Sequence, residues 1–167
     1  MIKKDDQDFW NFMYSLFFIT ISGILFFTVY TVKGSLPTSI PIFDFSIIIL
    51  ATFRLTRLFV YDKIAKFFRD FFTIVEERYT EEGVTYFEKK EPVYGPKRTA
   101  YDLLTCPWCF SVWASVVVVF FYLITPISWV IICILAISGV ASFIQITANM
   151  IGWSAENGKL EALRGKK

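Results

Sequence analysis

Two cysteines lie three residues apart in the segment Cys106-Pro-Trp-Cys109, directly before a long apolar run. Pro107 is favoured in the first turn of a helix, so we expect Cys106 to be the N-cap and Cys109 to lie in the first turn. Unpaired N–H groups and the positive end of the helix dipole favour a thiolate at that position. The pair is a structural helix start, a thiol oxidoreductase centre with Cys106 as nucleophile and Cys109 as resolving thiol, or part of a zinc site.

The composition limits the second and third of these interpretations. The chain has three cysteines and no histidine, so no imidazole can serve in a catalytic or zinc site built by this chain alone. Cys133 lies in the middle of another apolar run, so Asp102 or a second subunit would have to complete a zinc site. No thioredoxin-like βαβ pattern surrounds the pair. We therefore expect a structural helix start in a non-enzymatic protein without a cofactor, with thiol chemistry or a zinc-bridged dimer as alternatives.

Two arginines, Arg54 and Arg57, interrupt a second apolar run and share one helix face because they are three residues apart. Three interpretations are open for their side chains. They extend to lipid phosphates at the membrane surface, they bind an anionic group inside a helix bundle, or they pair with Asp62, Asp102 or backbone carbonyls. Extension to lipid phosphates is the simplest of the three.

The last apolar run carries a polar stripe, in which Ser138, Ser142, Gln145 and Asn149 follow helical spacing. Such a stripe packs most simply against neighbouring helices, where Gly139 and Ala141 permit close approach. Because Gln145 and Asn149 belong to the same half of the membrane as the arginines, we expect a shared polar cluster. Its expected members are Arg54, Arg57, Arg98, Asp102, Cys106, Cys109, Gln145 and Asn149, and the candidates for binding an anion or lipid are Arg54, Arg57, Arg98, Gln145 and Asn149.

These residues have to be positioned by membrane helices, because 55% of the chain is hydrophobic and the mean hydropathy is +0.52. A helix needs roughly 20 apolar residues to cross the hydrocarbon core. The sequence predicts an all-α integral membrane protein whose domain 10–151 has four spans, at about 10–32, 42–61, 107–124 and 127–151. A net charge of +2 does not favour nucleic acid as a partner. The expected partners are the lipid bilayer and either a second copy of the chain or another membrane protein.

The loop 62–106 between the second and third spans is the largest polar segment. Residues 63–75 follow an amphipathic helical pattern that predicts a helix in the membrane interface, and residues 81–90 predict a small hairpin. Basic residues gather in 1–9, in the loop and in the tail 152–167, whereas the connection between the last two spans has none. The positive-inside rule therefore predicts that the loop and both termini are cytoplasmic, and a basic interfacial helix favours binding of a protein partner or an anionic lipid headgroup.

Three motifs occur in a characteristic order: ATFRLTRLFVYDKI, GPKRTAYDLLTCPWC and the Trp113 that follows. By these motifs the segment from about Phe45 to Ile151 resembles the uncharacterised bacterial family known as domain of unknown function 1360. That family occurs in Firmicutes and their phages and includes a sporulation-associated membrane protein of bacilli. The resemblance implies a bacterial cytoplasmic membrane protein in sporulation, immunity or phage exclusion, without an established activity. The family pattern maps onto Arg54, Arg57, Asp62, Arg98, Cys106, Trp108, Cys109 and Trp113.

Overall fold

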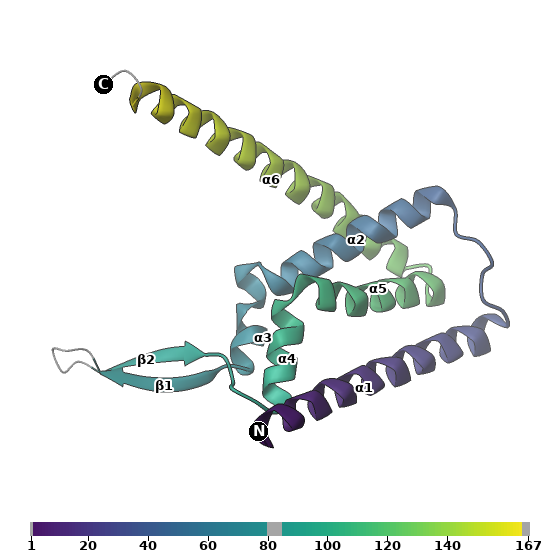
Figure 1. Ribbon diagram of the computed structural model, residues 1–167. Helices are drawn as coiled ribbons and strands as arrows, with labels where there is room; N and C mark the ends of the chain where they lie inside the picture. The colour runs from purple at the N-terminus through teal and green to yellow at the C-terminus, as the bar shows by residue number, and fades with distance from the viewer. Residues whose placement is uncertain (1, 80–84, 165–167) are drawn as a thin grey trace.

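A computed structural model describes residues 2–79 and 85–164 of the chain. The start of the predicted hairpin at 81–84 and the basic residues Lys166 and Lys167 lie outside the described residues. The described part is mostly helical (Figure 1). Its elements are α1 (Ile2–Lys33), α2 (Ile42–Val60), α3 (Lys66–Phe71), β1 (Ile74–Tyr79), β2 (Thr85–Lys90), α4 (Pro96–Thr105), α5 (Pro107–Ile124) and α6 (Ser128–Arg164).

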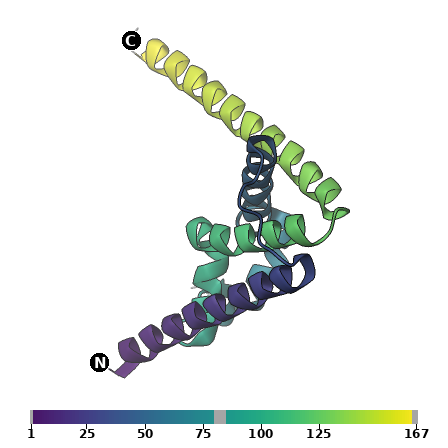
Figure 2. The same cartoon turned by 90° about the vertical axis from the view of Figure 1, so that its right-hand side faces the viewer.

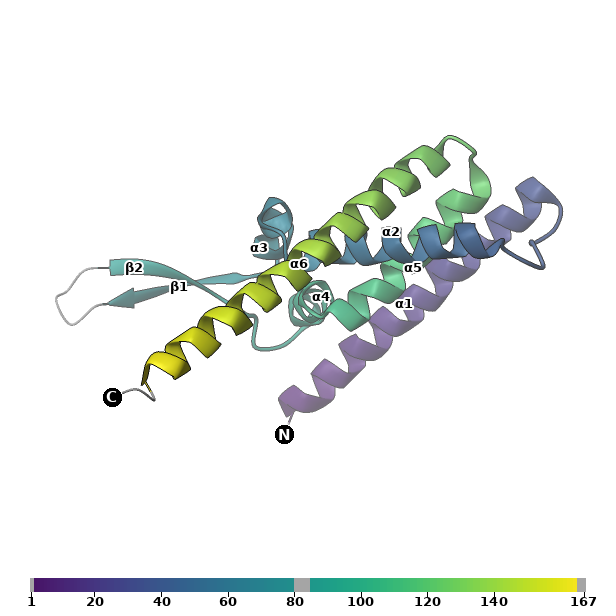
Figure 3. The same cartoon turned by 90° about the horizontal axis from the view of Figure 1, so that it is seen from above.

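The four long helices α1, α2, α5 and α6 alternate in direction. Their short connections, 34–41 and 125–127, lie together at one end, and the N-terminus, the β-hairpin and the C-terminal part of α6 lie toward the other (Figures 1 and 3). We call the latter the basic end, because it carries Lys63, Lys66, Arg69, Lys89, Lys90, Lys97 and Arg98.

Three segments of these helices are long and apolar enough to cross a membrane: 7–33, 107–124 and 128–161. Three of the four predicted spans therefore coincide with such helices. The remaining one, α2, has only 19 residues and carries Asp44, Arg54 and Arg57, so its length and composition alone do not identify it as a span.

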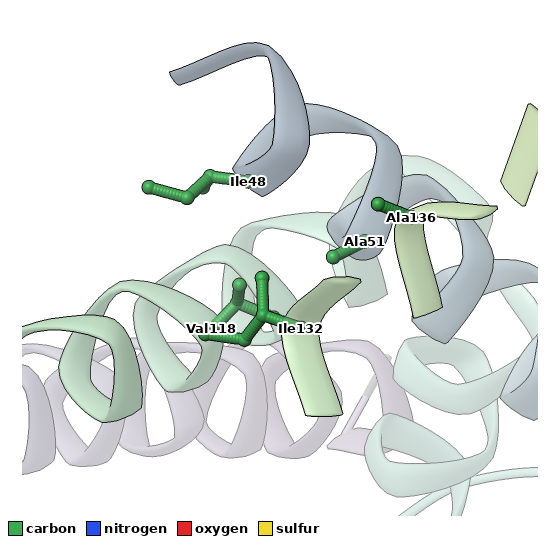
Figure 4. Packing of buried hydrophobic residues seen from close by; sticks show 5 residues of the cluster. All are labelled: Ile48, Ala51, Val118, Ile132 and Ala136. Carbon is green, nitrogen blue, oxygen red and sulfur yellow. The ribbon is translucent and has the colours of Figure 1, made fainter. Parts of the chain in front are cut away.

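The core lies where α2 packs between α5 and α6 (Figure 2). Ile48 and Ala51 from α2 meet Val118 from α5 and Ile132 and Ala136 from α6, and all five side chains are buried (Figure 4). Alanines at two of these positions keep the helix axes close, as small residues do at membrane helix interfaces. The helix that carries Arg54 and Arg57 is thus also the central one.

Gly139 marks the closest approach of α2 and α6. A Cβ atom added to Gly139 would lie 2.6 Å from the carbonyl oxygen of Leu50 and 3.4 Å from the Cβ of Arg54. The sequence prediction that Gly139 permits close helix approach is therefore confirmed. Ala141, in contrast, is exposed and does not contribute to this contact.

The segment after α2 differs from the prediction of one interfacial helix over 63–75. A 3₁₀ turn, Lys63–Ala65, leads into the six-residue α3, which ends at Phe71. Ile74 and Val75 instead begin β1 and pair with Lys90 and Lys89 of β2, because β-branched residues are favoured in strands. The hairpin expected at 81–90 begins earlier, because its first strand is β1 at 74–79. The predicted all-α class is therefore incomplete, since the chain also contains this two-stranded hairpin.

The helix that includes the predicted fourth span does not end at residue 151. It continues without a break through Gly152 to Arg164, so the tail forms one helix with the span. The C-terminal part of α6 extends away from the other helices (Figures 1 and 2), and residues 151–161 are exposed.

A polar network attaches the first turns of α1 to α4. Gln7 donates from Nε2 to Thr99 Oγ1 at 2.8 Å and accepts from the Gly95 N–H at 2.9 Å. Thr99 in turn donates to Asn11 Oδ1 at 3.0 Å. Further along α1, the ring of Phe18 packs edge-on against Trp113 of α5 with centroids 4.7 Å apart. These contacts hold α1 against the α4–α5 corner.

The contact at Gly139 predicts a specific loss of stability. In Gly139→Ala, the added methyl group forces α2 and α6 apart, and overpacking of this kind costs about 1–3 kcal/mol. Gly152→Ala is the matched control on the same helix, because a Cβ there meets nothing within 4 Å. We expect the control to keep or raise stability by ~0.5–1 kcal/mol, as for other helical glycines. Unfolding of the purified protein in mixed micelles, followed by circular dichroism, measures both; equal stability of the two variants would contradict the contact.

Candidate functional site

The structure brings four of the predicted binding residues together in a groove between α2 and α6. Arg54 and Arg57 of α2 face Gln145 and Asn149 of α6 across a cavity of about 400 Å³. Gln145 donates to Asn149 Oδ1 at 3.0 Å, so the two amides form one hydrogen-bonded pair. We call this cavity the polar groove; it is also lined by Asp62, Ser138, Ala141, Ser142 and Ile146.

Within the polar groove, Arg54 already has an anionic partner. Its guanidinium lies 2.9 Å from the Asp62 carboxylate, and the two side chains are only 20% and 29% exposed. Arg69 donates to the backbone carbonyls of Phe59 and Asp62, which belong to the end of α2 and the turn after it. Arg54 therefore helps to hold the turn after α2, which is one of the three interpretations of the sequence.

Arg57 has a different environment. Its guanidinium carbon lies 5.5 Å from the centre of the Tyr61 ring, within the range of a cation–π contact. It forms no ion pair with any of the residues that the structure describes. In this part of the chain, Arg57 thus differs from Arg54, whose charge Asp62 compensates.

Arg57 also lines a second cavity, of about 470 Å³, between α2 and the start of α5. Most of its wall is apolar or aromatic, and we call it the apolar groove. Ser111 and two threonines supply the other polar groups. The residues that line it are Ile49, Thr52, Phe53, Thr56, Arg57, Tyr61, Pro107, Trp108 and Ser111.

Arg98 and the cysteines do not line the polar groove, so the single predicted cluster is divided into two parts. Arg98 lies on α4, where its Nε donates to Asp102 at 2.9 Å. The same guanidinium lies 3.1 Å from Glu91 and donates to the Pro92 carbonyl at 3.2 Å. Arg98 therefore joins the end of the hairpin to α4, and its charge is compensated by two carboxylates.

The cysteine pair has the local geometry that the sequence predicts. Cys106 is the N-cap of α5, and its Sγ accepts a hydrogen bond from the Cys109 N–H at 3.3 Å. Hydrogen bonding from the Cys109 thiol, and then from this N–H, lowers the pKa of the Cys106 thiol, which lies just before the membrane-spanning segment. Cys133 lies in the second turn of α6. The start of α6 is at the end of the long helices opposite to the start of α5 (Figure 1).

Cys109 opens into a third cavity, of about 360 Å³, between α1, α4 and α5. We call it the thiol cavity; it is lined by Asn11, Tyr14, Ser15, Phe18, Ile19, Thr99, Asp102, Leu103, Cys109 and Trp113. Within residues 2–79 and 85–164, no three side chains of His, Cys, Asp or Glu come close enough together to hold a metal ion. A zinc site shared between two subunits stays a prediction.

Two sets of residues at the basic end were missed by sequence reasoning. Gln7 and Asn11 attach α1 to Thr99, and Arg69 binds the carbonyls that end α2. The sequence could have indicated the first set, because Gln7 and Asn11 are two amides four residues apart and share one face near the start of an apolar helix. Arg69 has none, since its partners are backbone atoms of another segment.

The matches to known proteins cover the central part of the chain. The family model described as "Protein of unknown function (DUF1360)" matches residues 47–148. The "UPF0713 protein YngL" of Bacillus subtilis (strain 168) is 35% identical over 102 residues, which are 60% of this chain and 75% of the relative. The "Sporulation protein YjcA" of the same organism is 34% identical over 100 residues, 58% of this chain and 82% of the relative. No solved structure matches. The chain therefore belongs to the DUF1360 family of proteins of unknown function.

Proposed function

We propose that this protein is a non-enzymatic membrane protein that binds the anionic headgroup of a phospholipid at its cytoplasmic face through Arg57. One observation carries the proposal: the guanidinium of Arg57, which no carboxylate of the described residues compensates, lies in the wall of both the polar groove and the apolar groove. An amphipathic ligand with a phosphate and an acyl chain matches that pair of cavities.

The proposed orientation follows from where the charges lie. The basic end has many cationic side chains, whereas the connection 125–127 at the other end has none. The positive-inside rule assigns the basic end, with both termini, to the cytoplasm. The N-terminal part of α1 and the C-terminal part of α6 lie at the same end of the long helices (Figure 3), which supports an even number of spans, with α2 as the proposed fourth span.

The apolar groove favours a lipid over a free anion. From Tyr61 to Ile49 it follows α2 for twelve residues, or about 18 Å along the helix. Tyr61 and Trp108, at its polar end, are 57% and 83% exposed. Exposed Tyr and Trp side chains are typical of the membrane–water interface, which is the depth of lipid phosphates. An acyl chain would lie along Phe53 and Ile49 while the phosphate meets Arg57.

Arginine suits this role because its guanidinium can donate two parallel hydrogen bonds to a phosphate. The amides of Gln145 and Asn149 and the hydroxyl of Ser142 line the same polar groove and would bind the remaining headgroup oxygens. Arg54 would contribute little, because Asp62 compensates its charge.

The biological setting we propose is a bacterial membrane process such as sporulation, since one relative is named a sporulation protein. Immunity and phage exclusion are the alternative settings. A second copy of the chain or another membrane protein would then act together with the bound lipid.

Removal of the Arg57 charge tests the proposal. In detergent titrated with phosphatidylglycerol or phosphatidylcholine, native mass spectrometry is expected to show preferential binding of the anionic lipid to the wild type. Arg57→Gln should reduce that preference about fivefold, which corresponds to ~1 kcal/mol for one partly exposed ion pair. Arg57→Lys keeps the positive charge but not the planar guanidinium, so its preference for the anionic lipid should fall less than that of Arg57→Gln.

The matched control is Lys159→Gln, which removes the same charge from the exposed C-terminal part of α6. It should leave the preference unchanged. Quenching of Trp fluorescence by phosphatidylglycerol with brominated acyl chains reports the acyl chain separately when the wild type is compared with Trp108→Phe, because Trp108 is one of five tryptophans and lines the apolar groove. Equal loss in the two charge variants, or equal affinity of the wild type for both lipids, would disprove a headgroup site at Arg57.

The ion pair between Arg54 and Asp62 predicts that another substitution raises the affinity for the anionic lipid. Asp62→Asn removes the only carboxylate that lines the described polar groove and so releases the charge of Arg54 toward a phosphate. Affinity for phosphatidylglycerol should therefore rise by about threefold to fivefold, although the turn after α2 loses its ion pair. The double variant Asp62→Asn/Arg54→Gln should lose this gain, and the same mass-spectrometric titration measures both.

A further inference from the structure

We propose that Cys106 and Cys109 are a redox-active dithiol, which closes to a reversible disulfide by exchange with the disulfide bond of a small thiol compound or a protein at the membrane surface. This inference rests on the arrangement of α4, α5 and α1 around the pair. It is independent of lipid binding at Arg57.

The first step of the argument is the arrangement of the two thiols themselves. Cys106 has extended backbone angles, φ −91° and ψ 110°, and Cys109 lies in the first turn of α5. The Cys106 Sγ accepts from the Cys109 N–H at 3.3 Å. The Cys106 sulfur therefore already lies against the residue that carries the second thiol.

The second step concerns the charges around Cys106. The carboxylate of Asp102 opposes a thiolate at Cys106, whereas the N–H groups at the start of α5 favour it. Arg98 lies 2.9 Å from Asp102 and compensates that carboxylate. The titratable or charged side chains in the wall of the thiol cavity are Asp102 from α4, Tyr14 from α1 and Cys109 itself. Arg98 thus acts as a positioning residue, which holds the competing charge of Asp102 away from the thiolate.

The third step is access. Cys106 is half-buried and Cys109 is exposed. The thiol cavity beside Cys109 has a volume of about 360 Å³, which is enough space for a reacting group. Aromatic side chains of Tyr14, Phe18 and Trp113 line that cavity. A disulfide at the end of a peptide or a small thiol compound can therefore reach the pair without unfolding of α5.

The exchange proceeds in two balanced steps. The Cys106 thiolate attacks one sulfur of the incoming disulfide, forms a mixed disulfide, and releases the other half as a thiolate that takes up a proton. Cys109 then loses its proton, attacks the Cys106 sulfur and displaces the second half of the compound as a thiol. The pair loses two electrons and two protons, and the incoming disulfide is reduced to two thiols.

The test equilibrates the full chain in detergent with glutathione and glutathione disulfide, then counts free thiols by alkylation with a maleimide and mass spectrometry. We expect oxidation to remove two of the three free thiols and leave Cys133 alkylated. The intact protein should then carry a Cys106–Cys109 bond and no glutathione. Cys109→Ser should instead accumulate glutathione on Cys106, because the resolving thiol is absent.

Cys106→Ser is a control that keeps the fold, because serine is a favourable N-cap. It should not form the internal disulfide, and circular dichroism confirms its helix content. Three results would overturn the proposal: a wild type that stays fully reduced in excess glutathione disulfide, a wild type that accumulates glutathione adducts, or a purified wild type whose thiols are occupied by zinc.

The role of Arg98 has its own readout, the pH profile of iodoacetamide alkylation at Cys106. Arg98→Gln exposes the thiolate to the Asp102 carboxylate and should slow alkylation at pH 7 about threefold by raising the pKa of Cys106. The double variant Arg98→Gln/Asp102→Asn should restore the rate, because the opposing charge is then gone. Lys97→Gln, an exposed neighbour on the same turn, should have no effect. Slowing that persists in the double variant would show that Arg98 acts only through the fold.

Discussion

The close approach of two helix backbones at Gly139 is the constraint on which the rest of this structure depends. Leu50 of α2 and Gly139 of α6 come so near that even a methyl group has no room between them. Ala51 and Ala136 lie in the same interface, and the buried core is centred there (Figure 4). Small residues thus let α6 lie across α2, and that crossing brings the polar stripe of α6 against the arginines of α2.

A central helix with two arginines has to compensate or use both charges, since an isolated charge in a membrane domain is costly. The charges of Arg54 and Arg57 lie in different environments, although only three positions separate the two residues. Arg54 points toward the turn after α2 and pairs with Asp62, so its charge stabilises local structure. Arg57 lies over the ring of Tyr61 and lines two grooves, and among the described residues no carboxylate pairs with it.

The start of α5 connects the two parts of the basic end. Trp108 lies between Cys106 and Cys109 in the chain, and its side chain lines the apolar groove beside Arg57. Cys109 instead lines the thiol cavity between α1, α4 and α5. One helical turn therefore takes part in both candidate sites. The family match at 47–148 includes this turn and α2, whereas α1 lies outside it. The thiol cavity is thus closed by a helix beyond the family segment, attached through Gln7, Asn11 and Thr99.

The sequence by itself determined the features that depend on local composition and spacing. Apolar length predicts α1, α5 and α6, a proline after a polar residue predicts Cys106 as an N-cap, and helical spacing predicts one polar face on α6. Only the tertiary structure decided which of these features meet. The packing of α2 against α6 places Arg57, but not Arg98, beside the polar stripe. The turn after α2 brings Asp62 to Arg54 as its ion-pair partner. Ile74 and Val75 form a strand because they pair with residues of β2. The physical reason is that such partners lie far apart in the chain, and periodicity carries no information on which faces of two helices will be pressed together.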